Sequence, residues 1–288
     1  MSKLLYYLIL LPLSKLPTSL LHGISTVVYY ILYKLIGYRT KVVFGNLERS
    51  FPEKSRKELK AIESDFYRHF CDLIFESIRL FSMPLEEWRA RSVATNPEIL
   101  DPYFEQGRPI IVFEPHYGNW EVAGTCYPQF TQYDSVAFYS PLKDPFFDKI
   151  MSESRGRAGF QLIDKKKIKT FFETNKNHTV AIYFGGDQSP TSSKKSFWMD
   201  FLNQDTAMTF GTEKYAVEYD CPVFYAQVDR IKRGYYSITL KLVTDKPKEE
   251  EHGFITRKNM ELLEKQINEE PRYWLWTHRR WKRKRHMG

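Results

Sequence analysis

Hydrophobic and polar residues follow two different periods along the chain, so both helices and strands are expected. Ser55 and Glu58 have the spacing of a capping box, and apolar residues then recur at helical intervals up to Pro84, which predicts one long amphipathic helix. Short apolar runs that are typical of strands follow at residues 109–114, 135–139, 180–184, 222–229 and 235–243. Helical patterns separate these runs, from about Gly118 and over residues 144–157, 165–174 and 206–219.

Strands that alternate with helices indicate an α/β fold with a mixed, mostly parallel sheet flanked by helices. The last two strands are separated only by Ile231 to Gly234, so we expect an antiparallel pair at an edge of the sheet. We expect two parts: an N-terminal helical segment at residues 1–40, and a body at residues 41–288 that ends in a basic, aromatic tail.

The N-terminal segment is apolar enough to meet a membrane. Residues 4–13 are apolar, and residues 18–36 contain only His22 and Lys34 as groups able to carry charge. About 20 apolar residues can span a bilayer. Because no small-x-small cleavage pattern follows the first run, we expect a retained segment that spans once or lies in the interface, with Arg39 and Lys41 on the cytoplasmic side. A pair of buried core helices is the alternative.

The net charge favours anionic partners. Forty-three Lys and Arg against 35 Asp and Glu give +8, which suits nucleic acid, acidic lipid or a phosphorylated substrate. Basic residues crowd positions 279–285, directly after Tyr273, Trp274 and Trp276, so an anionic membrane surface is a candidate partner; a merely solvated end is the alternative. No nucleic-acid-binding signature is present, and nucleic acid is not expected as a partner.

The three cysteines, Cys71, Cys126 and Cys221, are widely spaced and odd in number. This pattern suggests neither a disulfide framework nor a zinc site. We expect reduced, mostly buried thiols in a cytoplasmic compartment.

Two polar clusters follow predicted strands. The first begins at His116 and ends at Glu121, and the second contains Gly185, Gly186, Asp187 and Gln188. Sites in open α/β sheets gather beyond the carboxyl ends of the strands. Gly118 and the first N–H groups of the helix after it would suit a developing oxyanion or a phosphate.

His116 and Glu121 form the candidate catalytic pair. Histidine suits general-base work near neutral pH, and a carboxylate on its other nitrogen would fix the tautomer. Five positions are about 140° around one helix, so the pair meets only if His116 precedes the helix and Glu121 lies in its first turn. Pro115 and Gly118 allow this arrangement. A structural histidine beside a carboxylate at a helix start is the alternative.

HYGNWE at residues 116–121 resembles the H-x4-D/E motif of the glycerolipid and lipid A acyltransferase superfamily, and the wider pattern resembles its late lipid A (lauroyl/myristoyl) branch. Ser140, between Tyr139 and Pro141, stands where many members of the family carry an arginine. The acidic residue of the motif is Glu121 and not the aspartate of glycerol-3-phosphate relatives, which fits the lipid A branch better. The similarity runs in order through Asn46-Leu47, Phe51-Pro52, HYGNWE, Tyr139 with Pro141, Arg155 and Arg157 with Asp164, Asp187-Gln188 and YWLWTHRRW at 273–281.

The resemblance implies an acyltransferase with a glycerolipid acyltransferase-like fold, at the cytoplasmic face of a bacterial inner membrane. His116, oriented by Glu121, would take the proton from a hydroxyl of a lipid acceptor. That hydroxyl would attack the thioester of acyl carrier protein or acyl-CoA. No cofactor, metal or covalent enzyme intermediate is required.

The resemblance also implies residues that contact the substrates. Arg157, and with it Arg155, would stabilise an oxyanion or bind a phosphate, unless they are surface arginines at a helix end. Asp187 would hold an arginine or the acceptor, or cap a loop. The expected contacts are Gly118, Asn119, Arg155, Arg157, Asp187, Gln188, Arg279 and Arg280. For Arg279 and Arg280, which would meet acceptor phosphates, a solvated helix end is the alternative.

Other functions are less compatible with the sequence. Within the acyltransferase interpretation, a lipid A precursor is the favoured acceptor and a lysophospholipid or an aminolipid is the alternative. A metal-dependent hydrolase would use His116, Glu121 and Asp187, but H-x4-E is not a zinc-site spacing. A non-catalytic membrane scaffold would not need both polar clusters at the same edge of the sheet.

Overall fold

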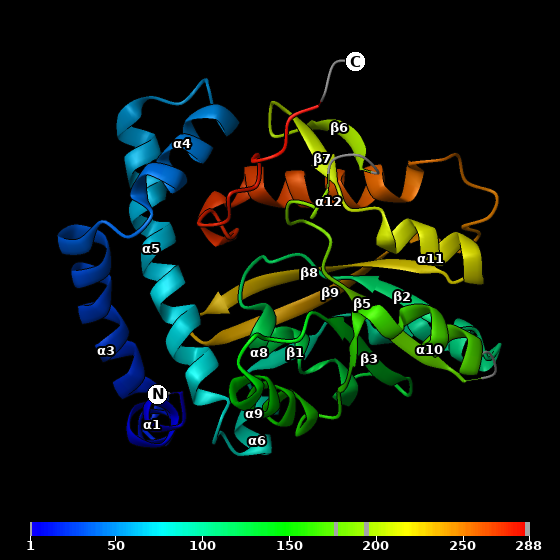
Figure 1. Cartoon of the computed structure of the whole chain (residues 1–288), viewed down its shortest axis with the longest axis horizontal. Helices are drawn as coiled ribbons and strands as arrows, with labels where there is room; N and C mark the ends of the chain where they lie inside the picture. Colours follow the sequence, from blue (N-terminus) through cyan, green and yellow to red (C-terminus); the bar gives the residue numbers. More distant parts are fainter. Residues whose placement is uncertain (1, 176–177, 193–195, 286–288) are drawn as a thin grey trace.

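The computed structural model describes residues 2–175, 178–192 and 196–285 and has a mixed seven-stranded sheet flanked by helices (Figure 1), as predicted. The strand order is β1-β9-β8-β2-β5-β3-β4, and every neighbouring pair is parallel except β8 with β9. The strands are β1 (Ser92–Ala94), β2 (Ile110–Phe113), β3 (Asp134–Tyr139), β4 (Gln161–Asp164), β5 (Val180–Phe184), β8 (Val223–Lys232) and β9 (Tyr235–Thr244), with a separate hairpin of β6 (Phe197–Phe201) and β7 (Gln204–Met208).

The helices divide into an N-terminal group, a long central helix and the helices of the α/β body. The first group is α1 (Ser2–Leu5), η1 (Tyr6–Leu10), α2 (Leu11–Ser14), α3 (Thr18–Tyr29), η2 (Tyr30–Ile36) and α4 (Thr40–Ser50), followed by the central helix α5 (Arg56–Arg79). The body contains α6 (Leu85–Arg89), η3 (Pro97–Leu100), α7 (Asp101–Glu105), α8 (Trp120–Gly124), η4 (Tyr127–Gln129), α9 (Pro145–Gly156), η5 (Lys165–Lys167), α10 (Ile168–Thr174), α11 (Gly211–Tyr219), α12 (Phe254–Glu269) and η6 (Pro271–Tyr273).

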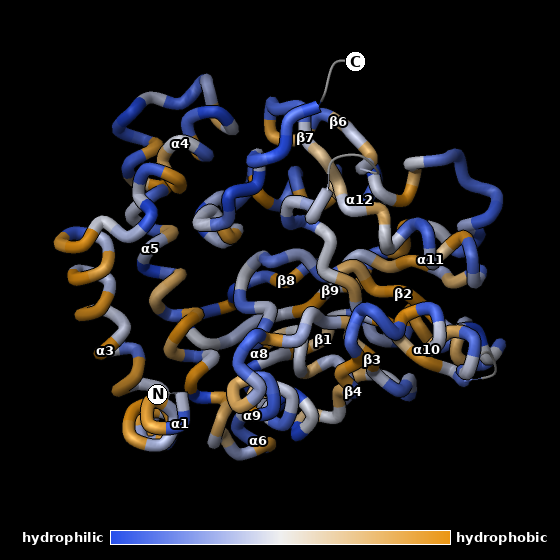
Figure 2. Tube along the Cα trace, viewed as in Figure 1, coloured by the Kyte–Doolittle hydropathy of each residue, from blue (hydrophilic) through white to orange (hydrophobic). Residues whose placement is uncertain are grey.

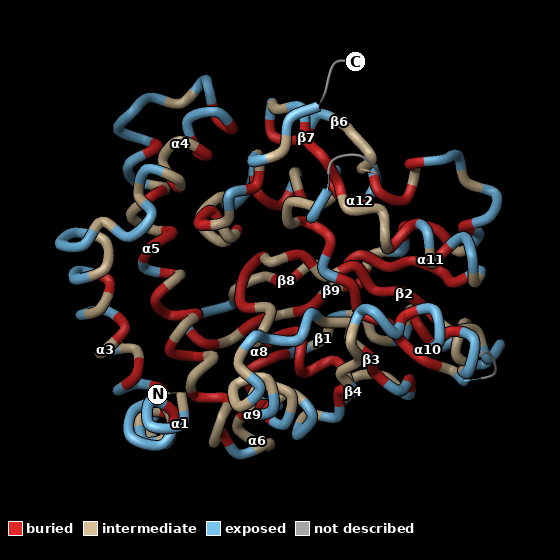
Figure 3. The backbone as a smooth tube through the Cα atoms, in the orientation of Figure 1, coloured by how far each residue is buried: buried red, intermediate tan, exposed pale blue. Residues whose placement is uncertain are grey.

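Two hydrophobic layers cover the two faces of the sheet. Successive side chains of a strand point to opposite faces. Ile111 and Phe113 of β2 accordingly pack in one layer with residues of α5, α10 and α12, whereas Ile110 and Val112 pack in the other with residues of α6 and α8. Figure 3 shows the central strands as the most continuously buried part of the chain. Burial on both faces explains why β2 and β5 appear in the sequence as unbroken apolar runs.

The long amphipathic helix is confirmed as α5. Ser55 caps it: its Oγ accepts from the backbone N–H of Glu58 at 3.3 Å, and Glu58 Oε2 accepts from the backbone N–H of Ser55 at 2.8 Å. All three cysteines are buried and free, which agrees with their predicted environment.

Several strands were not predicted. β1, β4 and the β6–β7 hairpin have no clear period in the sequence, and β7 occupies the start of the segment predicted as helix at 206–219. The hairpin turn is made by Leu202 and Asn203, both with positive φ (50° and 61°), without the Asn-Gly or Asp-Gly pair that signals such turns. The predicted antiparallel pair is present, but β1 takes the edge beside β9, and β8 lies inside the sheet.

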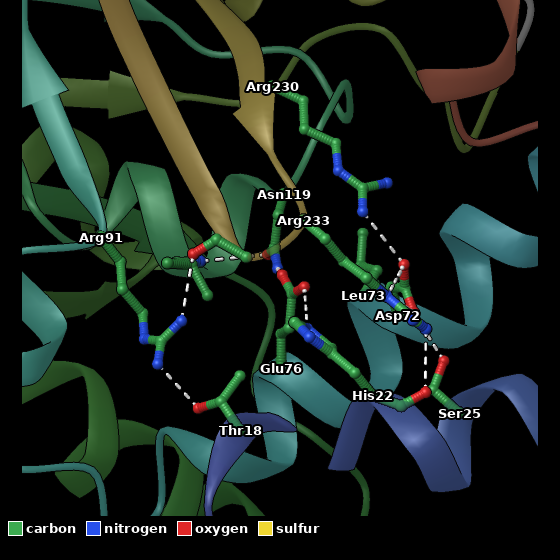
Figure 4. A network of polar contacts seen from close by, with 12 residues as sticks. Thr18, His22, Ser25, Asp72, Leu73, Glu76, Arg91, Asn119, Arg230 and Arg233 are labelled. Carbon is green, nitrogen blue, oxygen red and sulfur yellow. Dashed lines mark hydrogen bonds and ion pairs between the residues drawn. The ribbon is translucent and has the colours of Figure 1, made fainter. Parts of the chain in front are cut away.

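The N-terminal helix α3 packs along α5 through a polar face (Figure 4). His22 Nε2 and Glu76 Oε1 are 2.8 Å apart, Ser25 Oγ donates to Asp72 Oδ1 at 2.7 Å, and Tyr29 lies within hydrogen-bonding distance of Ser64. Many other residues of the N-terminal group are apolar, as the hydropathy colours of Figure 2 show, and several of them, including Leu8, Leu20 and Val27, are exposed. Among the described residues, only the helix over Thr18–Ile36 is long and apolar enough to cross a membrane, judged by length and composition.

Candidate active site

The register between β2 and β5 brings together the two polar clusters found in the sequence. These strands are parallel neighbours, and Phe113 lies opposite Phe184. Three residues beyond each member of this pair, His116 and Asp187 meet, with His116 Nδ1 2.7 Å from Asp187 Oδ1. The edge of the sheet predicted to carry a site therefore carries a histidine–carboxylate pair.

Asp187 is a buried carboxylate with a partner for each oxygen. His116 Nδ1–H donates to Oδ1, and the indole Nε1–H of Trp274 donates to Oδ2 at 2.9 Å. Burial alone would raise the pKa of Asp187, but the charge and hydrogen bond of His116 and the bond from Trp274 outweigh burial and lower this pKa to about 2. Asp187 is therefore ionised, and it holds the His116 tautomer that leaves Nε2 free.

His116 is partly exposed, with 26% of its side chain accessible. Burial lowers its pKa, but the charge and hydrogen bond of Asp187 and the charge of Glu121 outweigh burial, so the pKa lies above the usual 6.5. The ring of Trp120 packs edge-on against the imidazole, with 5.0 Å between the ring centroids. His116 is thus a basic imidazole in a fixed orientation.

The prediction that Glu121 orients His116 by direct contact is wrong. The carboxylate of Glu121 instead pairs with Arg155, through Nε at 3.1 Å and Nη2 at 2.6 Å. The reason is local: Asn119 caps α8, so Glu121 lies in the first turn of that helix and faces α9, where Arg155 is located. The two-pronged geometry is the strong form of an arginine–carboxylate pair. Burial lowers the pKa of Arg155, but the charge of Glu121 outweighs it and raises this pKa above its usual value.

A cavity of about 160 Å³ opens beside His116. His116, Glu121 and Arg155 line its polar part. Its remaining walls are mostly apolar and aromatic, and include Ala137, Phe138, Phe160, Leu162 and Phe184. The site therefore offers a base and a paired cation next to a space suited to an apolar group.

Glu114 lies at the same cavity with an unpaired carboxyl atom. Its Oε1 is shielded from solvent and has no hydrogen-bond partner among the described residues. Gly124 makes room for it, since a Cβ on that residue would clash with Oε1. Burial, and after it the charge of Glu121, raises the pKa of Glu114 to about 8, so the group is mostly a neutral acid at pH 7.

Gly118 and Asn119 shape the turn between His116 and α8, and neither lines the cavity. Gly118 has φ +62°, and a Cβ there would approach Val228 Cγ1 to 3.0 Å. Asn119 is buried, accepts from the backbone N–H of Val122 at 3.1 Å and donates to Glu76 at 2.7 Å. Gly118 and Asn119 therefore hold the turn in place. That they also contact the substrate stays a prediction.

Two of the predicted anion-binding arginines have structural partners instead. Arg157 donates to backbone carbonyls just after α5, at 3.1 Å to Leu80 and 2.6 Å to Met83, and so satisfies groups that a helix end leaves unpaired. Arg280 is buried and donates to the carbonyl of Ala207 at 2.8 Å. Neither arginine lines the cavity beside His116, and a contact with phosphate stays a prediction for both. Arg279 is exposed, and Gln188 is half-buried next to Asp187.

The C-terminal run contributes more to the site than its sequence suggested. Beyond the bond from Trp274 to Asp187, the N–H of Leu275 donates to the carbonyl of His116 at 3.2 Å. His278 Nε2 accepts from the backbone N–H of Ser189 at 3.0 Å, and burial lowers the pKa of His278 to about 4. Spacing along the chain gave no signal for these contacts, because they join segments that are far apart in sequence.

Comparisons with known proteins place the chain in a family. The chain matches the family model described as bacterial lipid A biosynthesis acyltransferase over residues 2–283. It is also similar to the lipid A biosynthesis lauroyltransferase of Escherichia coli (strain K12), with 25% identity over 279 residues, which cover 93% of this chain and 87% of the relative. The family match includes both His116 and Asp187 as well as the C-terminal run that holds them.

Asp187→Asn should lower the pKa of His116, because the charge that favours the imidazolium is removed while the amide can still accept from Nδ1. NMR titration of the histidine rings measures this pKa, with His116→Ala to assign the signal. Asp164→Asn removes a charge near η5 and should leave the His116 titration unchanged. An unchanged His116 pKa in Asp187→Asn would contradict the pairing.

Glu114→Gln should raise the free energy of unfolding relative to the wild type, and this gain should grow as pH rises. In the wild type, the folded state keeps a proton on Glu114 that the unfolded chain releases, so stability is lost between pH 4.5 and about pH 8. The variant lacks this loss and should gain roughly 3 kcal/mol at pH 7, because about 2.5 pH units separate pH 7 from the unfolded pKa. Urea unfolding at pH 5 and pH 8 measures the difference. Glu105→Gln, on an exposed residue, is the control, and a gain that does not grow with pH would refute the buried neutral acid.

Proposed function

The chain belongs to the bacterial lipid A biosynthesis acyltransferase family, and from this premise we propose that it moves a fatty acyl chain from an acyl thioester onto a hydroxyl of a lipid A precursor. One observation carries the proposal beyond the family: His116 bonds through Nδ1 to the ionised Asp187 and lines a cavity with mostly apolar walls. A base next to an apolar slot is what transfer of an acyl chain to a hydroxyl requires.

In the proposed reaction, His116 acts as the general base. Asp187 accepts from Nδ1–H, so Nε2 takes the proton of the acceptor hydroxyl as its oxygen attacks the thioester carbonyl carbon. The C–O bond forms, the C–S bond breaks, and the departing thiolate receives the proton from His116. The negative charge of Asp187 stabilises the imidazolium that exists between these two proton transfers.

Arg155 is suited to the charge that develops on the thioester oxygen. It lines the cavity with His116, and its pairing with Glu121 uses Nε and Nη2. We assign Glu121 the role of positioning Arg155 and of adding negative charge near His116. A preorganised cation of this kind stabilises an oxyanion without having to move during the reaction.

The N-terminal segment, residues 1–40, is proposed to attach the enzyme to the cytoplasmic face of the bacterial inner membrane. The polar side of α3 is bonded to α5, whereas Leu20 and Val27 on its other side are 51% and 59% exposed, and Ile31 of the following helix η2 is 42% exposed. A helix with one face docked on the protein and the other apolar suits the interface better than a span across the bilayer. The exposed Lys282 and Lys284 add positive charge that favours anionic lipid.

His116→Ala should lower the rate of acyl transfer by roughly two to four orders of magnitude, the range for a positioned general base. The assay uses purified protein, a lipid A precursor as acceptor, and acyl carrier protein or coenzyme A as the donor carrier. His178→Ala, on an exposed histidine, is the control. Turnover like the wild type in His116→Ala would contradict the mechanism, and transfer to a lysophospholipid or aminolipid alone would contradict the proposed acceptor.

Replacing Leu20, Val27 and Ile31 together by Gln should release much of the protein from membranes, because each change removes apolar area that would enter the interface. Transfer to a short acceptor dispersed in detergent should be retained, since His116 lies in the α/β body. The matched control replaces Val93, Val217 and Leu242, which are exposed on the body. Full sedimentation of the first variant with membranes at high salt would exclude the apolar face of α3 and η2 as the attachment.

A further inference from the structure

A second cavity, of about 470 Å³, lies between α3, α5, the β8–β9 hairpin and η6. It is larger than the cavity beside His116, and none of the residues predicted from the sequence to bind substrate lines it. Its lining is rich in groups that recognise anions and hydroxyls.

Four arginines from three parts of the fold line this cavity: Arg68 on α5, Arg230 and Arg233 at the β8–β9 hairpin, and Arg272 on η6. Asp65 and Asp72 are the carboxylates among the lining residues.

Asp72 is shared by two of these arginines, Arg230 at 3.2 Å and Arg233 at 2.9 Å, which converge on it in Figure 4. Arg272 pairs with Glu270 outside the lining, and Arg68 is 3.9 Å from Asp65. The lining thus holds four guanidinium groups and two carboxylates, and this excess of positive charge favours an anionic ligand.

His69 adds an unused hydrogen-bond acceptor. It is buried and lines the cavity, and its Nε2–H donates to the carbonyl of Gly118 at 3.0 Å. Burial, and after it the charge of Arg230, lowers the pKa of His69 to about 4, so the ring is neutral and Nδ1 carries a lone pair. Nδ1 has no partner among the described residues. A buried acceptor of this kind is costly unless a ligand or water donates to it.

The surroundings of the cavity suit an amphiphile. Tyr30 lines the cavity and is 54% exposed, next to the exposed apolar Val27 and Ile31. On the inner side, Tyr273 lines the cavity and accepts from the backbone N–H of Gly118 at 3.0 Å. The cavity therefore reaches from the apolar face of the N-terminal segment to the turn that carries His116.

We propose that this cavity binds the phosphorylated sugar headgroup of the lipid acceptor. A phosphate bonds to Arg68 and Arg272, and a sugar hydroxyl donates to Nδ1 of His69, while the acyl chains of the acceptor lie along the exposed face of α3. This inference rests on the proposed function, because it assigns the acceptor of the same reaction to a second site, across the Gly118 turn from the cavity beside His116.

The variant Arg68→Gln with Arg272→Gln removes two charges without stranding a buried carboxylate. Their carboxylates are exposed, Asp65 by 45% and Glu270 by 50%, whereas the Asp72 partner of Arg230 and Arg233 is only 5% exposed. The Arg68→Lys, Arg272→Lys variant keeps the charge and should retain part of the binding. Arg89→Gln with Arg257→Gln changes the net charge equally at exposed positions outside the cavity and is the matched control.

Binding is measured with a phosphorylated glucosamine lipid in neutral detergent micelles, and with the same lipid after removal of its phosphate. We expect the wild type and the control to bind the phosphorylated probe more tightly. The double Gln variant should bind it about 10–100-fold more weakly, with little change toward the dephosphorylated probe. In steady-state transfer, the variant should raise KM for the acceptor and leave kcat nearly unchanged.

Equal binding of the phosphorylated probe by the wild type and the double Gln variant would overturn the headgroup site. Competition by phosphatidylglycerol micelles as strong as that of the glycolipid would also overturn it, because the cavity would then take any anionic lipid. Phosphate-dependent binding without acyl transfer would support this site while contradicting the proposed function. Acyl transfer that does not depend on the acceptor phosphate would support the proposed function while contradicting this site.

Discussion

The hydrogen bond from His116 Nδ1 to Asp187 Oδ1 is the interaction that organises the site. It joins the ends of the two parallel strands β2 and β5, and a buried, ionised Asp187 is tolerable only because His116 and Trp274 both donate to it. Because this bond uses Nδ1, the other ring nitrogen of His116, Nε2, remains available at the cavity. Trp274 in turn ties the C-terminal run to the site, so the last segment of the chain completes a centre whose other parts lie far earlier in the sequence.

The proposed chemistry divides two carboxylates between two tasks. Asp187 orients the base and stabilises its charged form, whereas Glu121 holds Arg155, the cation expected to meet the oxyanion. The sequence motif places a histidine and a glutamate in one short segment, which suggested a direct pair. In three dimensions each of them takes its partner from a distant element, and the two ion pairs lie side by side at one cavity.

The sequence predicted the α/β class, the strands that carry the site and the residues His116 and Asp187, because buried strands give unbroken apolar runs and polar clusters follow their ends. Apart from the antiparallel pair of the last two strands, it did not predict which strands are neighbours. Without the register of Phe113 opposite Phe184, no pattern distinguishes Asp187 from Glu121 as the partner of His116. The β6–β7 hairpin was missed because Leu202 and Asn203 adopt positive φ without a glycine, and the arginine-lined cavity because its residues come from four separate segments.

Mass spectrometry of the lipids in a strain that lacks this protein tests the account most directly, since it reads acceptor and transferred chain in one measurement. The account predicts that a sugar-bearing lipid loses one ester-linked acyl chain in the deletion strain. The wild-type gene should restore that chain, and the gene encoding His116→Ala should not. An unchanged set of sugar-bearing lipids with an altered phospholipid or aminolipid, or full restoration by His116→Ala, would contradict it.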